Sequence, residues 1–293
     1  MQKGTGIQVS SLCLALSCLL GDIETRSDSG KPPEGSHHQE VPKGTVTAYV
    51  WDGSEVYPET WRLYWVYVPV QYDPDRPSAL MVFQDGSNFL QGKDHFHAPG
   101  VFDKLIHLGE MPVTIGVFIN PGKVGFPQRD QDQLEHRSLE YDSEGDAYAR
   151  FLLDEILPEI GRHYRLSNDP EMRAICGNRS GGVCAFTVAW ERPDAFGKLV
   201  CHMGSFVNIR GAYSYPALIR KTERKALRVF LQGAMTDLDN VHGNWSLANK
   251  QMEAALRFMK YDYRMVWGTE GHDLSHAARI FPQTMRWLWR DFR

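Results

Sequence analysis

The stretch that decides the fold is residues 172–186, Met-Arg-Ala-Ile-Cys-Gly-Asn-Arg-Ser-Gly-Gly-Val-Cys-Ala-Phe. An apolar run ends at Cys176, a glycine-rich turn follows, and apolar residues then recur at helical spacing. This order predicts a strand, a sharp turn and a helix. Gly177 and Gly181 stand two residues before and two residues after Arg179, so a strand and a helix can pass closely around it.

The same order of elements forms the nucleophile elbow of α/β-hydrolases, in which a Gly-x-Ser-x-Gly turn presents the attacking serine. The two flanking glycines place Arg179 at the position of that serine. A guanidinium stays protonated and has no lone pair with which to attack a carbonyl. Arg179 therefore cannot replace the serine as a nucleophile.

Ser180 is the neighbouring hydroxyl, but a motif centred on it would put Asn178 where close packing of strand and helix requires glycine. In the favoured register the Ser180 backbone N–H is a donor of the oxyanion hole, and its hydroxyl lies at the start of the helix. An alternative is an ordinary strand-to-helix turn in which Ser180 is merely the N-cap. One glycine-rich turn is a weak signal, so the residues leave both interpretations open.

Length and charge narrow the possible classes of protein. The chain has 293 residues, a formal net charge of −4 and a pI near 6.3. It is long enough for one large α/β domain or two small ones, and it lacks the basic footprint of a nucleic-acid-binding protein. Its five cysteines show neither metal-ligand spacing nor a disulfide framework. No metal site and no nucleic-acid partner are predicted.

Residues 1–21 resemble a targeting segment, because Lys3 supplies a positive charge ahead of an apolar stretch over 9–20. That stretch is too short to span a bilayer comfortably. We therefore expect export, to the periplasm or out of the cell, without a stable membrane span. Cys18 leaves a lipid anchor open. The alternative is a misassigned start codon with an untranslated or unstructured leader.

Residues 22–43 are rich in Gly, Ser, Pro, Glu and His, a composition that predicts a disordered linker. The folded domain is then expected to occupy residues 44–293, with no internal repeat.

Within that domain, buried apolar runs alternate with amphipathic segments, which predicts a mostly parallel sheet with helices on both faces, an α/β fold. Two strands of antiparallel type, 44–51 and 62–69, come first. A turn is expected over 72–78 and a polar loop over 123–138, and Pro158 is expected to kink its helix. The buried strands are predicted at 79–84, 113–119, 172–176, 198–203, 228–232 and 263–267, and the helices at 101–108, 145–164, 247–259 and 279–292.

In such a sheet the ligand lies at the carboxyl ends of the strands, so the polar residues that follow each strand are candidates for the site. Asp237 follows the strand 228–232, and a carboxylate there would orient an imidazole and stabilise its charged form. Asp239 is the reserve, although either aspartate could simply cap the next helix.

His272 follows the last strand, where the general base of an α/β-hydrolase belongs, and His276 lies nearby and could point into solvent or a pocket. The order of elbow, acid and histidine matches that fold. Gly86 follows the strand 79–84, and its N–H is predicted to point at the substrate carbonyl as an oxyanion donor. The simpler alternative for Asp85-Gly86 is an ordinary turn.

Together these motifs resemble the esterases of the enterochelin-esterase type, relatives of esterase D and the mycolyltransferases, over about residues 64–292. The resemblance implies an α/β-hydrolase fold and hydrolysis of carboxylic esters without a metal or an organic cofactor. The family elbow is Gly-x-Ser-Ser-Gly-Gly or Gly-x-Ser-x-Gly, and its first serine aligns with Arg179. The runs that carry the resemblance are residues 82–86, 137–142, 177–182, 237–240, 242–245, 271–272 and 286–289.

Three hypotheses follow for the function of the protein, and the expected partner is a small-molecule ester. The first is a serine esterase in which Ser180 is recruited as nucleophile, His272 is the base, Asp237 orients it, and the N–H groups of Gly86 and Ser180 form the oxyanion hole. In it, Arg179 leaves activity weak or lost. The second is a catalytically inactive binding protein, in which Arg179 supplies a fixed positive charge for a carboxylate or phosphate. The third is an acyltransferase on the same fold, since it would share the acyl-enzyme.

Overall fold

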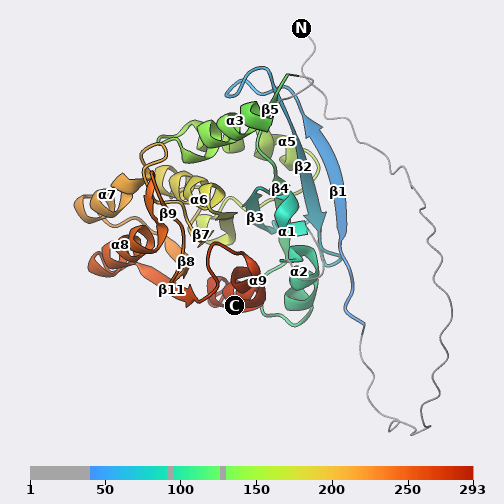
Figure 1. Ribbon diagram of the computed structural model, residues 1–293. Helices are drawn as coiled ribbons and strands as arrows, with labels where there is room; N and C mark the ends of the chain where they lie inside the picture. Colours follow the sequence, from blue (N-terminus) through green and yellow to red (C-terminus); the bar gives the residue numbers. More distant parts are fainter. Residues whose placement is uncertain (1–39, 91–95, 126–129, 293) are drawn as a thin grey trace, which may run out of the picture.

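A sheet of nine strands organises the protein, and its helices lie on both sides of it (Figure 1). The computed structural model describes residues 40–90, 96–125 and 130–292, with side chains of the third range from 134 onward. The strands are β1 (Thr45–Trp51), β2 (Thr60–Val68), β3 (Ala79–Gln84), β4 (Thr114–Ile119), β5 (Lys123–Val124), β6 (Arg173–Asn178), β7 (Lys198–His202), β8 (Arg228–Ala234) and β11 (Asp262–Gly268).

The main path of the sheet runs in the order β1-β2-β4-β3-β6-β7-β8-β11, and β5 pairs with β2 off this path. β1 and β2 pair antiparallel, as does β2 with β4, whereas every later pairing on this path is parallel. The predicted antiparallel entry and parallel body are therefore confirmed. A small hairpin of β9 (Asp239–Asn240) and β10 (Gly243–Asn244) lies apart from this sheet.

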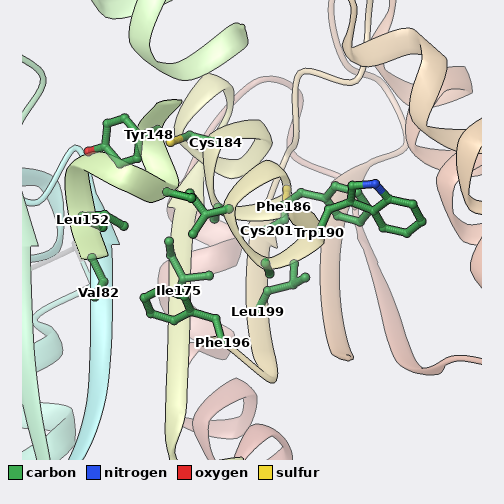
Figure 2. Close-up of a cluster of buried hydrophobic side chains, with 14 of the residues drawn as sticks. Val82, Tyr148, Leu152, Ile175, Cys184, Phe186, Trp190, Phe196, Leu199 and Cys201 are labelled. Atoms are coloured by element: carbon green, nitrogen blue, oxygen red, sulfur yellow. The ribbon is translucent and has the colours of Figure 1, made fainter. Parts of the chain in front are cut away.

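Two layers of helices cover the sheet. α2 (Ala98–His107) and α9 (Ser275–Leu288) contribute to one core, in which Phe83 stacks on Phe118 with ring centroids 4.6 Å apart. The other core contains the segment 147–161, α6 (Ser180–Glu191), α7 (Tyr215–Lys221) and α8 (Trp245–Phe258). Figure 2 shows its centre, where Ile175 of β6 and Leu199 of β7 lie beneath α6. Burial on both faces explains why these strands are almost entirely apolar.

The segment 123–138 is where the prediction of a polar loop is wrong. It begins with β5 and continues into α3 (Asp130–Asp142), a helix without an apolar stripe. Buried polar contacts hold α3 in place: Glu140 binds Arg62 of β2 through two oxygens, each at 2.8 Å. Periodicity cannot reveal a helix that is anchored by charge rather than by a hydrophobic face.

The predicted helix over 145–164 is present as three consecutive helical segments of different type. They are α4 (Ala147–Arg150), a π-helical stretch (Phe151–Ile156) and α5 (Leu157–Gly161). The wide π turn comes directly before Pro158, which has no N–H to continue the regular ladder. The expected kink at Pro158 stays a prediction, and the structure shows a change of helix type just before this residue. Shorter elements that the sequence did not indicate are α1 (Ser87–Leu90) and the 3₁₀ turns Pro170–Met172 and Ala212–Ser214.

The targeting segment predicted for residues 1–21 and most of the linker predicted for 22–43 lie outside the described residues, so export stays a prediction. In the part of the chain that the structure describes, no helix is long and apolar enough to cross a membrane. Cys176, Cys184 and Cys201 are free and buried, as their apolar surroundings in the sequence predicted.

We predict that Gly177→Ala destabilises the protein, whereas Gly161→Ala does not. A Cβ at position 177 would lie 2.0 Å from the Gly181 carbonyl oxygen, which is backbone and cannot move aside. Overpacking of this kind costs about 1–3 kcal/mol or more, which lowers the melting temperature of a domain of this size by roughly 2–10 °C. Gly161, at the end of α5, has nothing within 4 Å of such a Cβ. Differential scanning calorimetry compares the two variants, and equal melting temperatures would contradict the prediction.

Candidate active site

Arg179 occupies the apex of the turn between β6 and α6. Its backbone has φ 57° and ψ −121°, a conformation that side-chain-bearing residues rarely adopt. The Arg179 N–H donates to the carbonyl of His202 at 2.9 Å, and the Arg179 carbonyl accepts from the N–H groups of Gly182 and Val183. The strained elbow therefore forms around arginine, in the register that the flanking glycines predicted.

The Arg179 side chain turns toward the loop that carries His272. Its Nη2 donates to the His272 carbonyl oxygen at 3.0 Å, while Nε is buried without a partner among the described residues. Burial and the neighbouring Arg137 lower the pKa of Arg179, and the carboxylates of Asp237 and Asp85 act in the opposite direction. A guanidinium thus lies among acidic groups where the attacking hydroxyl of an ester hydrolase would be expected.

His272 and Asp237 form a pair, as the sequence predicted. Their Nδ1 and Oδ1 atoms are 2.5 Å apart, although the residues come from different loops, after β11 and β8 respectively. The Asp237 side chain is 1% exposed and also accepts from the Leu238 N–H at 2.7 Å. The Trp245 ring lies edge-on to His272, with centroids 6.2 Å apart. This arrangement fixes the imidazole and leaves its Nε2 for proton transfer.

The reserve assignments lie elsewhere. Asp239 is exposed in the β9–β10 hairpin. His276 sits one turn along α9, and its Nδ1 is 3.3 Å from Nε2 of the buried Gln232. The pairing of His272 with Asp237 therefore distinguishes it from His276.

Ser180 is the first residue of α6, and its hydroxyl faces α3 rather than the imidazole. Burial raises the pKa of Asp142, while hydrogen bonds from the hydroxyls of Ser180 and Ser138 act to lower it. The Ser180 backbone N–H has no acceptor among the residues that the structure describes. Ser180 is thus placed to donate from its backbone, and its hydroxyl is engaged with Asp142.

Gly86 does not fulfil its predicted role as an oxyanion donor. Its N–H donates to the Ile119 carbonyl at 2.9 Å, because the ladder between β3 and β4 continues beyond the end of β3. The adjacent N–H groups are also engaged: Asp85 donates to the Tyr141 hydroxyl at 3.1 Å and Ser87 donates to Asn120 Oδ1 at 3.1 Å. Glycine is required at position 86 because a Cβ would lie 2.3 Å from the Phe118 backbone.

Arg137 begins the run 137–142, for which the sequence left two roles open, lining the substrate pocket or forming a salt bridge, and it forms a salt bridge with Asp85. Its Nε and Nη2 bind both carboxylate oxygens of Asp85 at 2.9 and 2.6 Å, and its guanidinium lies 5.1 Å from the centre of the Tyr141 ring. Asp85 itself has a positive φ of 53°. The bidentate pair joins α3 to the end of β3, beside the elbow. The run 137–142 signalled its importance, but not its partner.

The described residues contain no group of His, Cys, Asp and Glu side chains arranged to hold a metal ion. The site contains an imidazole oriented by a buried carboxylate, a free backbone N–H and a guanidinium. The imidazole can accept a proton, the N–H can stabilise an anion, and the guanidinium can bind an anion. No hydroxyl in the described part of the chain is hydrogen-bonded to His272.

The strand order, the elbow and the pairing of His272 with Asp237 define an α/β-hydrolase fold. The chain belongs to the esterase family: the family model described as "Putative esterase" matches residues 59–291.

The chain is similar in sequence to the iron(III) enterobactin esterase of Dickeya dadantii, with 23% identity over 210 residues. The aligned region covers 66% of this chain but only 45% of that protein. Its fold is similar to that of the Shigella flexneri enterobactin esterase, with a TM-score of 0.69 at 19% identity, covering 87% of this chain and 61% of the other.

A ferulic acid esterase from Anaeromyces mucronatus is similar in fold, with a TM-score of 0.65 at 17% identity over 86% of this chain and 93% of that enzyme. At such identities the structural likeness establishes the fold alone.

We predict that Asp142→Asn becomes progressively more stable than the wild type as the pH rises. Burial raises the Asp142 pKa above its ordinary value of 3.8, so the folded state holds this proton more tightly than the unfolded chain. Stability from this group is complete below that value and is lost as the pH rises toward the folded-state pKa. Asparagine cannot ionise, and it keeps the contacts of Asp142 in neutral form.

Urea unfolding from about pH 4 to about pH 7 measures the difference. The exposed Asp239→Asn is the control, and its stability should follow that of the wild type. If instead the wild type gains stability relative to Asp142→Asn as the pH rises, the folded state favours the carboxylate and the prediction is wrong.

Proposed function

We propose that this protein is a carboxylic ester hydrolase of the enterobactin-esterase-like type, in which Arg179 closes the usual serine acyl-enzyme route and leaves activity weak. Membership in the esterase family supports the reaction class. The pairing of His272 with Asp237, at 2.5 Å, supports the assignment of base and orienting acid. The names of the relatives support a small ester as substrate.

The observation that carries the proposal is the position of Arg179. It has the strained φ of 57° that an elbow apex requires, and its guanidinium reaches the His272 loop. A serine at this position would place its hydroxyl next to the imidazole. Ser180 is a poor substitute, because its hydroxyl lies near enough to Asp142 to act on that carboxyl's pKa and the elbow would have to shift by one residue to redirect it.

We predict that Arg179→Ser raises hydrolysis of a p-nitrophenyl ester strongly. Loss of the nucleophile alone removes about 10⁶ in kcat in a serine protease, so its restoration in a largely prepared site should gain at least roughly 10³-fold. Steady-state kcat/KM and a burst of p-nitrophenol in the first turnover measure the gain. Ser180→Ala should change the restored enzyme little, whereas His272→Ala should abolish the gain.

A contrary outcome is equally clear. If Ser180→Ala eliminates a strong wild-type activity that Arg179→Ser does not increase, Ser180 is the nucleophile. The elbow would then be displaced by one residue from the conformation described above.

A second candidate function is the binding of a carboxylate without turnover. Arg179 Nε is buried without a partner, and the Ser180 N–H lies at the start of the 12-residue helix α6. A carboxylate at this point would meet a guanidinium and the positive end of the helix dipole. The same groups would also bind the acid product of ester hydrolysis.

We predict that benzoate binds to the wild-type protein and that Arg179→Met weakens this binding about tenfold or more, the effect of losing one hydrogen bond to a charged group. Arg179→Lys should keep part of the affinity. Isothermal titration calorimetry measures all three proteins. Equal affinity in the wild type and Arg179→Met would exclude Arg179 as the anion-binding residue.

A further inference from the structure

A second pocket lies at α3, and neither Arg179, Asp237 nor His272 lines it. Its volume is about 340 Å³, which suits a small molecule. The walls come from the connection between β1 and β2, the C-terminal half of α3, the connection from α3 to α4, and the start of α4. The side chains that matter for recognition are Tyr57, His136, Glu140, Glu144 and Tyr148.

Three rings form the walls of the pocket. Tyr57 and His136 have centroids 6.3 Å apart and stand almost perpendicular, at 82°, while Tyr57 and Tyr148 are 6.2 Å apart at 48°. Rings at such angles can turn electron-rich faces toward one shared space. Tyrosine faces attract cations, and cages of aromatic side chains bind organic ammonium groups in this way.

The charge of the lining points in the same direction. Glu140 and Glu144 both line the pocket, and none of its lining residues is lysine or arginine. The charge of Glu140 is largely offset by Arg62, which binds both of its oxygens. Glu144 is exposed, and its Oε1 accepts from the neutral Ser214 hydroxyl at 2.6 Å, so its negative charge remains. The pocket therefore favours a cation over an anion.

His136 binds Glu140, with its Nε2 2.8 Å from Glu140 Oε1. Burial acts to raise the Glu140 pKa, but His136 and Arg62 outweigh it, so this pKa is lowered and the carboxylate stays ionised. Glu140 is thus engaged by His136 and Arg62, and Glu144 is the lining carboxylate that can accept from a ligand. A ligand that donates hydrogen bonds fits this chemistry.

We propose that this pocket binds a small organic ammonium ion, with its cationic group against the Tyr57 and Tyr148 rings and its N–H bonds directed to Glu144. An anion of the same size would face the uncompensated charge of Glu144. An uncharged ligand would fill the space, but it would cover Glu144 without compensating its charge, which costs free energy. The proposal is independent of whether the esterase site is active.

Phenethylammonium is the probe, with 2-phenylethanol as its neutral analogue and phenylacetate as its anionic analogue. Isothermal titration calorimetry should show saturable binding of the cation, about tenfold or more tighter than the alcohol, and the weakest binding for the anion. Glu144→Gln and Tyr57→Leu should each weaken the cation roughly tenfold. Glu223→Gln, an exposed glutamate outside the pocket, is the matched control and should change nothing.

Three results would overturn the proposal. They are the absence of saturable binding at millimolar phenethylammonium, equal affinity for the alcohol, and loss of binding in His272→Ala but not in Tyr57→Leu. The last would place the cation in the catalytic site instead. Thermal unfolding of each variant separates loss of binding from loss of fold, and Glu144→Gln changes only an exposed side chain.

Discussion

The close approach of β6 and α6 at the elbow is the constraint on which the site depends. Gly177 faces the Gly181 carbonyl so closely that no side chain fits at position 177. The chain must then reverse within one residue, which forces Arg179 to a positive φ. Such strain is sustained only where surrounding contacts over-determine it, and here the β6–β7 ladder and the N–H bond from Arg179 to His202 do so. Whatever residue stands at this apex faces the His272 loop.

Polar contacts hold α3 in its position beside the site. α3 has little apolar surface, and two ion pairs hold it instead. Glu140 of α3 pairs with Arg62, both with fully buried side chains, and Arg137 of α3 donates two hydrogen bonds to Asp85. Removing one partner of a buried pair typically costs about 3–5 kcal/mol, because the other charge is left without compensation. The same helix contributes residues to the elbow region and to the pocket described above. Arg137 lies beside the elbow, and His136 and Glu140 line the second pocket.

The result is a site with most of the parts of a hydrolase in place and one position altered. The base and its orienting acid are joined at 2.5 Å, and a backbone N–H is free at the start of α6. The altered position carries a permanent positive charge where a hydroxyl would act. Arginine at the apex changes the electrostatics of the site as well as its nucleophilicity, since Asp237 and Asp85 now face a cation.

The sequence by itself determined the strands of the main sheet, most of the long helices and the elbow register, because apolar periodicity and glycine spacing are local properties. It also predicted the pairing of Asp237 with His272, from the order of elbow, acid and histidine along the chain. Only the tertiary structure decided the rest. It showed that the Gly86 N–H is used by β4, that the Ser180 hydroxyl turns to Asp142, and that 130–142 is helical. Each of these depends on a partner far away in the chain, across a ladder or an ion pair, and such partners leave no periodic trace in a single sequence.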